Sequence, residues 1–155
     1  MTMDEKRLAR ARNNAFSLLR MRPRSEHEIR ERLRLKGYGS EIIENVMASL
    51  EKAGYIDDAK FAKFWIDSRM HLNPVGDTVL KQELRLRGVN DALIESALRA
   101  KNEAYDEYAL AFDMARTRFE RLKKLDRAKA MKRLYDFLMR RGFKYETVQK
   151  IIENI

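Results

Sequence analysis

Few residues in this chain have the types and spacing that chemistry requires. Cysteine is absent, which excludes a thiolate metal site, a thiol nucleophile and disulfides. His27-Glu28 begins like the zinc-protease motif H-E-x-x-H, but Glu31 stands where the second histidine is required. His71 is the only other histidine, and two histidines are too few for a typical His-rich catalytic zinc centre. We therefore expect no metal site.

Signatures of other reactions are equally scarce. The six glycines are scattered and form no G-x-x-x-x-G-K-[ST] phosphate loop, and no nucleophile elbow is present. Asp57-Asp58 could act as an acid pair, but adjacent residues of a helix project in different directions, and Asp57 is well placed to cap a helix. The sequence predicts a protein that is not an enzyme, without cofactor or catalytic residue; an enzyme is the residual alternative.

Positive charge is what the chain has in quantity. It carries 33 Lys and Arg against 24 Asp and Glu, a net charge of +9. Residues 1–54 and 102–155 each have a net charge of +4, whereas residues 55–101 have +1. Such an excess favours encounter with polyanions. The alternative interpretation is that the charges lie on solvated helix faces and only aid solubility.

Targeting signals are not evident. Residues 1–14 lack the apolar stretch of a signal peptide, and no apolar run approaches the ~20 residues that span a bilayer. Together with the lack of cysteine, this predicts a soluble cytoplasmic protein that makes no membrane contact. We expect a monomer.

Three glycines, Gly37, Gly88 and Gly142, anchor an internal repeat. Apolar residues stand eight and four positions before each glycine and six, nine and ten positions after it: Ile29, Leu33, Ile43, Val46 and Met47; Leu80, Leu84, Ile94, Ala97 and Leu98; Leu134, Leu138, Val148, Ile151 and Ile152. This spacing predicts two amphipathic helices joined at the glycine. A glycine just past a helix end can take the left-handed conformation that closes the last turn.

Each helical hairpin is preceded by a break and by another helix. Pro23 and Pro74 lie fourteen residues before their glycines and mark the break, whereas the third copy has Ala128 there. Apolar patterns predict the preceding helices over residues 5–21, 58–71 and 103–122. Trp65 shares one face with Phe61 and Ile66, so we expect it in the core. The expected helix caps are Ser25, Ser40, Asp57, Asn90 and Asp126.

The sequence thus predicts an all-α fold of nine helices, arranged as three tandem three-helix repeats. We expect repeat 1 to cover residues 1–54, repeat 2 residues 55–101 and repeat 3 residues 102–155. Because a triplet of this size buries little surface alone, neighbouring triplets must share apolar area. We expect them to form an elongated, curved body.

Basic side chains follow the repeat as well. We define the basic stripe as the cations seven, three and one positions before the first two glycines, namely Arg30, Arg34, Lys36, Lys81, Arg85 and Arg87. Positions seven and three before the glycine are i and i+4 neighbours on a helix. Repeat 3 departs from this pattern and carries a basic cluster over residues 116–133 instead. The stripe predicts a binding face; the alternative is a solvated face balanced by Glu26, Glu28, Glu31 and Glu83.

The ordered series of segments resembles the RecX family, regulators of the bacterial RecA recombinase. The segments are RPRSEHEIRERLRLKG, VMASLEKAGYIDDAKFAKFWIDSR and LKQELRLRGV, and the likeness is looser in repeat 3. The resemblance implies tandem three-helix repeats and a non-enzymatic modulator that lies in the groove of the RecA–DNA filament. It also implies that such a protein limits filament growth and reduces ATP hydrolysis and strand exchange.

The resemblance implies the RecA filament as partner, and we expect weak binding of single- and double-stranded DNA. The predicted filament- or DNA-binding residues are Arg24, Arg30, Arg34, Lys36, Arg69, Lys81, Arg85, Arg87, Lys124 and Arg127. The alternative function is a direct DNA-binding protein whose triplets act as helix-turn-helix modules.

Overall fold

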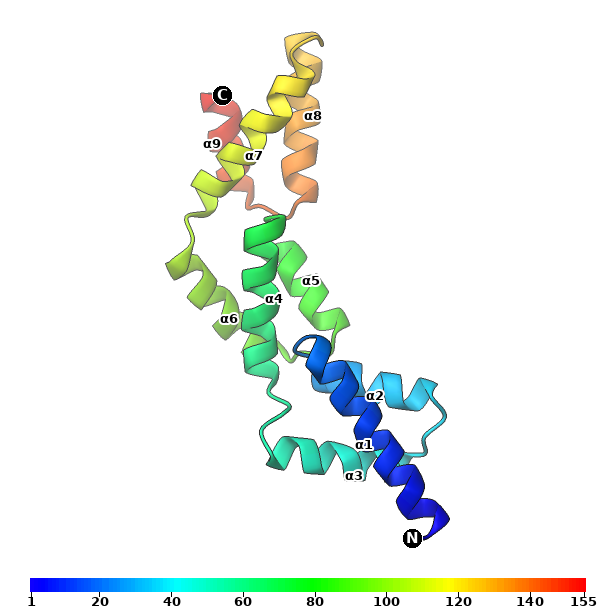
Figure 1. Ribbon diagram of the computed structural model, residues 1–155. Helices are drawn as coiled ribbons and strands as arrows, with labels where there is room; N and C mark the ends of the chain where they lie inside the picture. The colour runs from blue at the N-terminus through cyan, green and yellow to red at the C-terminus, as the bar shows by residue number, and fades with distance from the viewer. The chain divides into compact units, whose positions relative to one another are not determined.

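The chain folds into nine helices without a strand, as a computed structural model of all 155 residues shows (Figure 1). The helices are α1 (Met3–Met21), α2 (Glu26–Leu35), α3 (Ser40–Lys52), α4 (Asp58–Leu72), α5 (Asp77–Leu86), α6 (Asp91–Ala104), α7 (Glu107–Leu122), α8 (Arg127–Arg140) and α9 (Tyr145–Asn154). The all-α prediction is confirmed. The elongated shape and the domain boundaries stay predictions.

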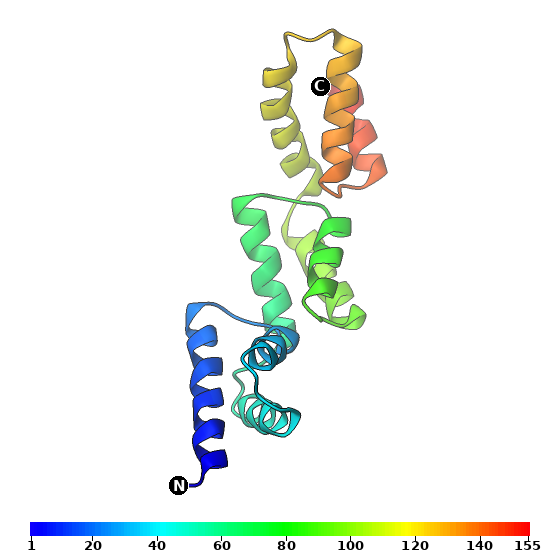
Figure 2. The same cartoon turned by 90° about the vertical axis from the view of Figure 1, so that its right-hand side faces the viewer.

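The helices form two compact units. Unit 1 consists of Met1–Phe64 and Leu84–Ile94, and unit 2 of Trp65–Glu83 and Glu95–Ile155. In unit 1, helices α1, α2 and α3 pack against one another, and in unit 2 helices α7, α8 and α9 do the same (Figures 1 and 2). Each set of three encloses its own apolar core.

The two cores are built alike. Ala11 and Ala15 of α1 are fully buried against α2 and α3, and Ala111 and Ala115 of α7 are fully buried against α8 and α9. Small side chains one turn apart let the first helix approach the hairpin closely. All apolar positions of the predicted repeat are buried except Ala97 and Ile152, which are half-buried. The spacing rule therefore located the core.

The glycine turns follow the prediction. Gly37, Gly88 and Gly142 have φ angles of +89°, +78° and +84°, in the left-handed region that closes a helix end. Gly54, which follows α3, has φ +78° and was not anticipated. The two helices of each hairpin therefore meet at the predicted glycine.

Three of the five predicted caps are confirmed by side-chain hydrogen bonds. Ser25 accepts from the backbone N–H of Glu28 (3.1 Å), Asn90 from that of Leu93 (2.9 Å), and Asp57 from those of Ala59 and Lys60 (3.0 and 3.2 Å). Because capping satisfies a backbone donor that has no partner within the helix, these bonds fix where α2, α4 and α6 begin.

Two other caps and one helix start differ from the prediction. Ser40 is wrong as a cap because Gly39 takes the extended cap conformation and Ser40 is already the first helical residue. Asp126 occupies the cap position of α8 without a side-chain bond. The helix predicted from residue 103 begins at Glu107, because α6 continues to Ala104 and Asp106 caps α7 through the N–H of Ala109 (3.1 Å).

The start of one hairpin packs against the glycine end of the next, and this junction occurs twice. In unit 1 the hydroxyl of Ser25 donates to the carbonyl of Arg87 (2.6 Å). In unit 2 the backbone N–H of Gly76 donates to the carbonyl of Arg141 (2.8 Å). Ser25 and Gly76 both lie twelve residues before the glycine of their own repeat. Consecutive repeats are therefore joined through equivalent positions.

Repeat 3 cannot continue this pattern. Its equivalent position is Ala130, which is buried inside α8 and whose N–H is already bonded to the carbonyl of Asp126 (2.9 Å). Helix α8 begins fifteen residues before its glycine, whereas α2 and α5 begin eleven before theirs. Because α8 starts early, Ala130 offers no free donor equivalent to Ser25 or Gly76.

The one buried cation has a structural partner. Lys101 of α6 is 4% exposed, and its ammonium group is paired with the carboxylate of Asp77, the first residue of α5. Asp77 also accepts a hydrogen bond from Asn102 (2.9 Å). Burial opposes ionisation of Asp77, but the bonds from Lys101 and Asn102 outweigh it and hold the pKa of Asp77 below its ordinary value.

Candidate binding surface

The basic stripe in unit 1 faces carboxylates of its own hairpin. Arg30 pairs with Glu26 one turn earlier (3.0 Å) and with Glu44 on α3, and Arg34 pairs with Glu31. The hydrogen bond with Glu44 raises the pKa of Arg30, and the same contact lowers the pKa of Glu44. The guanidinium groups of this stripe are thus compensated.

The ion pair between the two helices of the hairpin occurs again in repeat 2. Lys81 pairs with Glu95 (2.9 Å), and both pairs join the position seven before a glycine to the position seven after it. Arg85 pairs with Asp91 (2.9 Å). These ion pairs tie the two helices of a hairpin together. The repetition of basic residues at equivalent positions, which predicted a binding face, therefore also has a structural explanation.

Three further predicted residues lie near carboxylates. Arg24 and Arg87 approach Glu28 at 3.6 and 4.0 Å, and Arg69 pairs with Glu83 (2.8 Å). Trp65 is half-buried, and its indole N–H donates to Glu83 (2.7 Å), so it is a packed residue with a polar contact. Seven of the ten predicted binding residues thus face an acidic side chain. The others are Lys36, Lys124 and Arg127.

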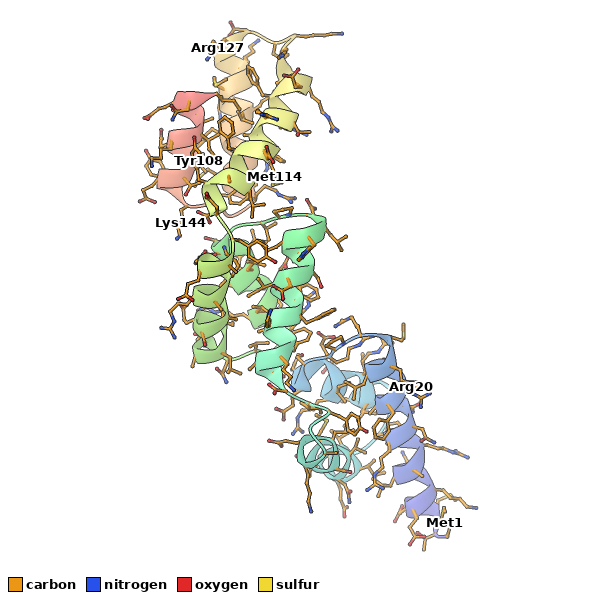
Figure 3. All side chains as sticks on the ribbon, turned by 60° about the vertical axis from the view of Figure 1, so that its left-hand side comes forward. Met1, Arg20, Tyr108, Met114, Arg127 and Lys144 are labelled. Carbon is orange, nitrogen blue, oxygen red and sulfur yellow. The ribbon has the colours of Figure 1, made fainter.

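Uncompensated charge gathers instead on α7 and α8. Residues 113–141 contain eleven Lys and Arg against four Asp and Glu, and their two ion pairs are Lys123–Glu120 (2.7 Å) and Lys132–Asp136 (3.0 Å). We define the α7–α8 cationic surface as the exposed cations Arg116, Arg121, Lys124, Arg127, Lys129 and Arg133. In Figure 3, Arg127 lies at the turn between α7 and α8, at the opposite end of this bundle from Lys144.

The sequence analysis found this cluster from its charge, but only Lys124 and Arg127 of it were among the predicted binding residues. Neither side chain is paired with an Asp or Glu; Arg127 makes one long hydrogen bond, to the backbone oxygen of Ile155 (3.5 Å). The signal that could have ranked the cluster first is the scarcity of acidic residues between 113 and 141. A phosphate that meets these cations displaces no Asp or Glu side chain.

A cleft of about 590 Å³ opens beside this surface in unit 2. It lies between α7 and the segment Asn73–Pro74, and its lining residues are Asn73, Pro74, Asp113, Met114, Arg116, Thr117, Arg118, Arg121 and Phe137. The guanidinium carbon of Arg118 lies 5.0 Å from the centroid of the Phe137 ring, which is cation–π distance. The Nε atom of Arg118 is buried without a hydrogen-bond partner.

Arg141 lies near the same ring and binds the segment Asn73–Pro74 that borders the cleft. Its guanidinium carbon is 5.9 Å from the Phe137 centroid, and its Nη2 donates to the carbonyl of Pro74 (2.7 Å) and to the side chain of Asn73. Burial, with a smaller contribution from Arg69, lowers the pKa of Arg141 from its ordinary value. Arg141 thus holds Asn73–Pro74 in place behind the cleft, whereas Arg116 and Arg121, which line the cleft, are exposed.

The structure shows neither a candidate metal cluster nor a membrane-spanning helix. No group of three or more His, Asp and Glu side chains is placed to hold a metal. None of the nine helices combines the length and the apolarity that crossing a bilayer requires. Cationic surface and open clefts are what the molecule presents for binding.

Comparison with known proteins identifies the family. The family descriptions "RecX, first three-helix domain", "RecX, second three-helix domain" and "RecX, third three-helix domain" match residues 11–50, 57–98 and 105–152 in order. The chain belongs to the RecX family. The resemblance seen in the sequence and the three tandem three-helix repeats are thereby confirmed.

Curated relatives carry the name "Regulatory protein RecX". The one from Amycolatopsis mediterranei is 34% identical over 139 residues, which cover 90% of this chain and 79% of the relative. The one from Prosthecochloris aestuarii is 33% identical over 153 residues, which cover 99% of this chain and 98% of the relative. The family name denotes regulation of RecA, and the RecX family is a family of regulatory proteins.

Solved structures share the fold of this RecX family member. The crystal structure of RecX from Lactobacillus salivarius has a TM-score of 0.80 at 21% identity, and the match covers 94% of each chain. Another RecX crystal structure has a TM-score of 0.82 at 21% identity and covers 95% of this chain and 72% of the other. At this identity the likeness concerns the fold alone.

Proposed function

We propose that this RecX family member binds the RecA–DNA filament and inhibits its ATPase activity, its extension and strand exchange. The observation that carries the proposal is the α7–α8 cationic surface on a chain of the RecX family. RecA bound to DNA offers a long polyanion, and exposed cations without carboxylate partners gain most from meeting one. Membership of the RecX family supports the RecA filament as the partner. The uncompensated cations support the α7–α8 cationic surface as the contact.

The mode of action that we propose needs no bond-making step. A monomer would occupy the filament in the cytoplasm and act by obstructing it, with its tandem repeats contacting the filament and its cations near DNA phosphate. Since the stripe cations Arg30, Arg34, Lys81 and Arg85 already have partners, we assign them a smaller share of binding than Lys124 and Arg127. Arg24, Lys36, Arg69 and Arg87 remain proposed contacts of secondary weight.

Sequence-specific DNA reading by helix-turn-helix modules is the weaker candidate. Such a module inserts the start of its second helix into the major groove, close to phosphates. Here the second helix of each hairpin carries an acidic residue in its first turn, Glu41 in α3, Asp91 in α6 and Glu146 in α9. A carboxylate at that place repels the DNA backbone, so the geometry favours filament binding over groove reading.

The test is a RecA ATPase assay on single-stranded DNA. We expect sub-stoichiometric protein to slow ATP hydrolysis, and the variant K124A/R127A/K129A to need at least ten times more protein for the same inhibition. The control R30A/R34A/K81A/R85A removes four cations, all of them paired with carboxylates. We expect this control to need less than three times more protein for the same inhibition. No inhibition by the natural chain at a one-to-one ratio would contradict the proposal.

A further inference from the structure

We propose that the cleft between α7 and Asn73–Pro74 is a binding site for the phosphodiester backbone of single-stranded nucleic acid. Arg116, Arg118 and Arg121 would be its phosphate ligands. This site deepens the proposed function, because it assigns a ligand to the cleft in unit 2. Its role in the cell rests on the proposed function. The binding itself requires no RecA.

The donors of the cleft are built for an oxyanion. Guanidinium groups present a planar fork of N–H donors that matches phosphate, and three of them line this one concavity. Arg118 is held against Phe137, which limits its conformational freedom before any ligand arrives. Its buried Nε has no acceptor, and none of the three arginines is paired with a carboxylate. The site thus has oriented donors and lacks an acceptor.

One acidic residue lines the cleft as well. Asp113 is exposed, and its backbone carbonyl accepts the hydroxyl of Thr117 (3.1 Å). A single exposed carboxylate against three guanidinium groups leaves the cleft positive. Because an exposed carboxylate is well solvated, its repulsion of a bound phosphate is weak.

The spacing of the cations along α7 and the turn after it favours a linear polyanion as ligand. Arg118 and Arg121 are three residues apart on α7, which is about 4.5 Å along a helix axis. Beyond the end of α7, Lys124 and Arg127 continue the series along the chain. A polynucleotide strand carries one charge per nucleotide and can follow such a series, whereas one acidic side chain would satisfy one cation and leave the rest.

The dimensions of the cleft favour a single strand over a duplex. A space of about 590 Å³ can hold a backbone segment of a nucleotide or two but cannot enclose a double helix. Two guanidinium groups already lie over the ring of Phe137, at 5.0 and 5.9 Å from its centroid, and would compete with a stacking base. Binding is therefore through phosphate and indifferent to base sequence.

The experiment is fluorescence anisotropy of a labelled 20-nucleotide oligothymidylate with the full chain, without RecA, at several salt concentrations. We expect R116A/R121A to weaken binding five- to twentyfold and to reduce the salt slope by about 1.4, since each lost single-strand phosphate contact removes about 0.7. The control R10A/R12A also removes two exposed arginines, from α1 of unit 1, and should weaken binding less than twofold.

A second variant tests whether binding needs the bidentate hydrogen-bond geometry of the Arg118 guanidinium group. R118K keeps the charge and loses the bidentate geometry, and circular dichroism would establish that it is folded. We expect it to bind the oligonucleotide at least threefold more weakly than the natural chain. R118K binding as tightly as the natural chain, or R116A/R121A behaving like R10A/R12A, would overturn the proposal. Tighter binding of a duplex or of poly-glutamate than of the single strand would overturn it as well.

The two proposals fail separately. If the natural chain binds the oligonucleotide through the cleft but never slows RecA, the proposed function is wrong and the cleft assignment stands. If the chain slows RecA while R116A/R121A and R10A/R12A bind the oligonucleotide equally, the cleft assignment is wrong and the proposed function stands.

Discussion

The backbone N–H of Gly76 donates to the carbonyl of Arg141 over 2.8 Å, so the start of α5 rests on the end of α8 inside unit 2. A Cβ at Gly76 would overlap the carbonyl of Gly142. The equivalent junction in unit 1 uses the hydroxyl of Ser25 on the carbonyl of Arg87. The junction in unit 2 is thus a backbone contact that leaves no room for a side chain at Gly76, whereas the junction in unit 1 is made by a small side chain.

The three turn glycines should respond differently to alanine. All three have positive φ, so G37A, G88A and G142A share a strain of roughly 1–2 kcal/mol. At Gly88 a Cβ would also overlap His27, and at Gly142 it would lie 2.7 Å from Cγ2 of Val79, whereas nothing lies within 4 Å at Gly37. We expect G88A and G142A to lower the urea midpoint clearly more than G37A does. Equal losses in all three variants would contradict the junction.

Ser25 should matter more than Ser40. S25A removes a helix cap and leaves the carbonyl of Arg87 without its fully buried donor, which we expect to cost about 2–3 kcal/mol. S40A is the matched control, since Ser40 is exposed and caps nothing, and it should change stability by less than about 0.5 kcal/mol. Chemical denaturation of the two variants measures the difference. A loss in S40A as large as that in S25A would refute this account.

The pair of Lys101 and Asp77 should stabilise the fold in a pH-dependent way. K101M leaves a half-buried carboxylate without its partner, and we expect a loss of about 3 kcal/mol at neutral pH. Because the pKa of Asp77 is lowered in the fold, its stabilisation is present above the pKa of the unfolded chain and is lost as pH falls through the folded value. The difference between natural chain and K101M should therefore shrink toward pH 2. A constant difference across that range would be the contrary result.

The contribution of Asp58 to stability should depend on pH in the opposite direction from that of Asp77. Its carboxylate accepts the N–H of Glu26 (2.9 Å), and burial, followed by the charge of Glu26 among others, raises its pKa. A raised folded pKa means that the contribution is present at low pH and is lost as pH rises. D58N keeps an acceptor without the charge, so its stability relative to the natural chain should improve between about pH 3.5 and pH 7. Thermal melts of D58N and the natural chain at the two pH values measure this change. A fall in the stability of D58N relative to the natural chain at the higher pH would contradict the prediction.

The ion pairs that join the helices of a hairpin should contribute to stability and little to binding. Arg30–Glu44 and Lys81–Glu95 are partly exposed, so a double-mutant cycle should give a coupling of about 0.2–1 kcal/mol for each. R30A and K81A should leave oligonucleotide binding within twofold of the natural chain. A strong binding defect in a folded R30A would show that the stripe, rather than the α7–α8 cationic surface, contacts the polyanion.

The sequence by itself determined the helices, their glycine turns and the buried face of each repeat. These features follow from local periodicity and from the backbone freedom of glycine, which act within a few residues, so Leu33, Leu84 and Leu138 could be placed in cores directly. It also determined the family resemblance. Local rules erred where two residues compete for one role, as when Gly39 rather than Ser40 caps α3.

Only the tertiary structure decided which cations are compensated. An ion pair such as Arg30–Glu44 joins residues on two helices, and whether two side chains meet depends on how those helices pack. The same holds for the contact of Gly88 with His27 and for the cleft that brings Arg118 beside Phe137 and Asn73. Charge can be counted along a chain, but its partners are fixed by the packing of segments distant in sequence.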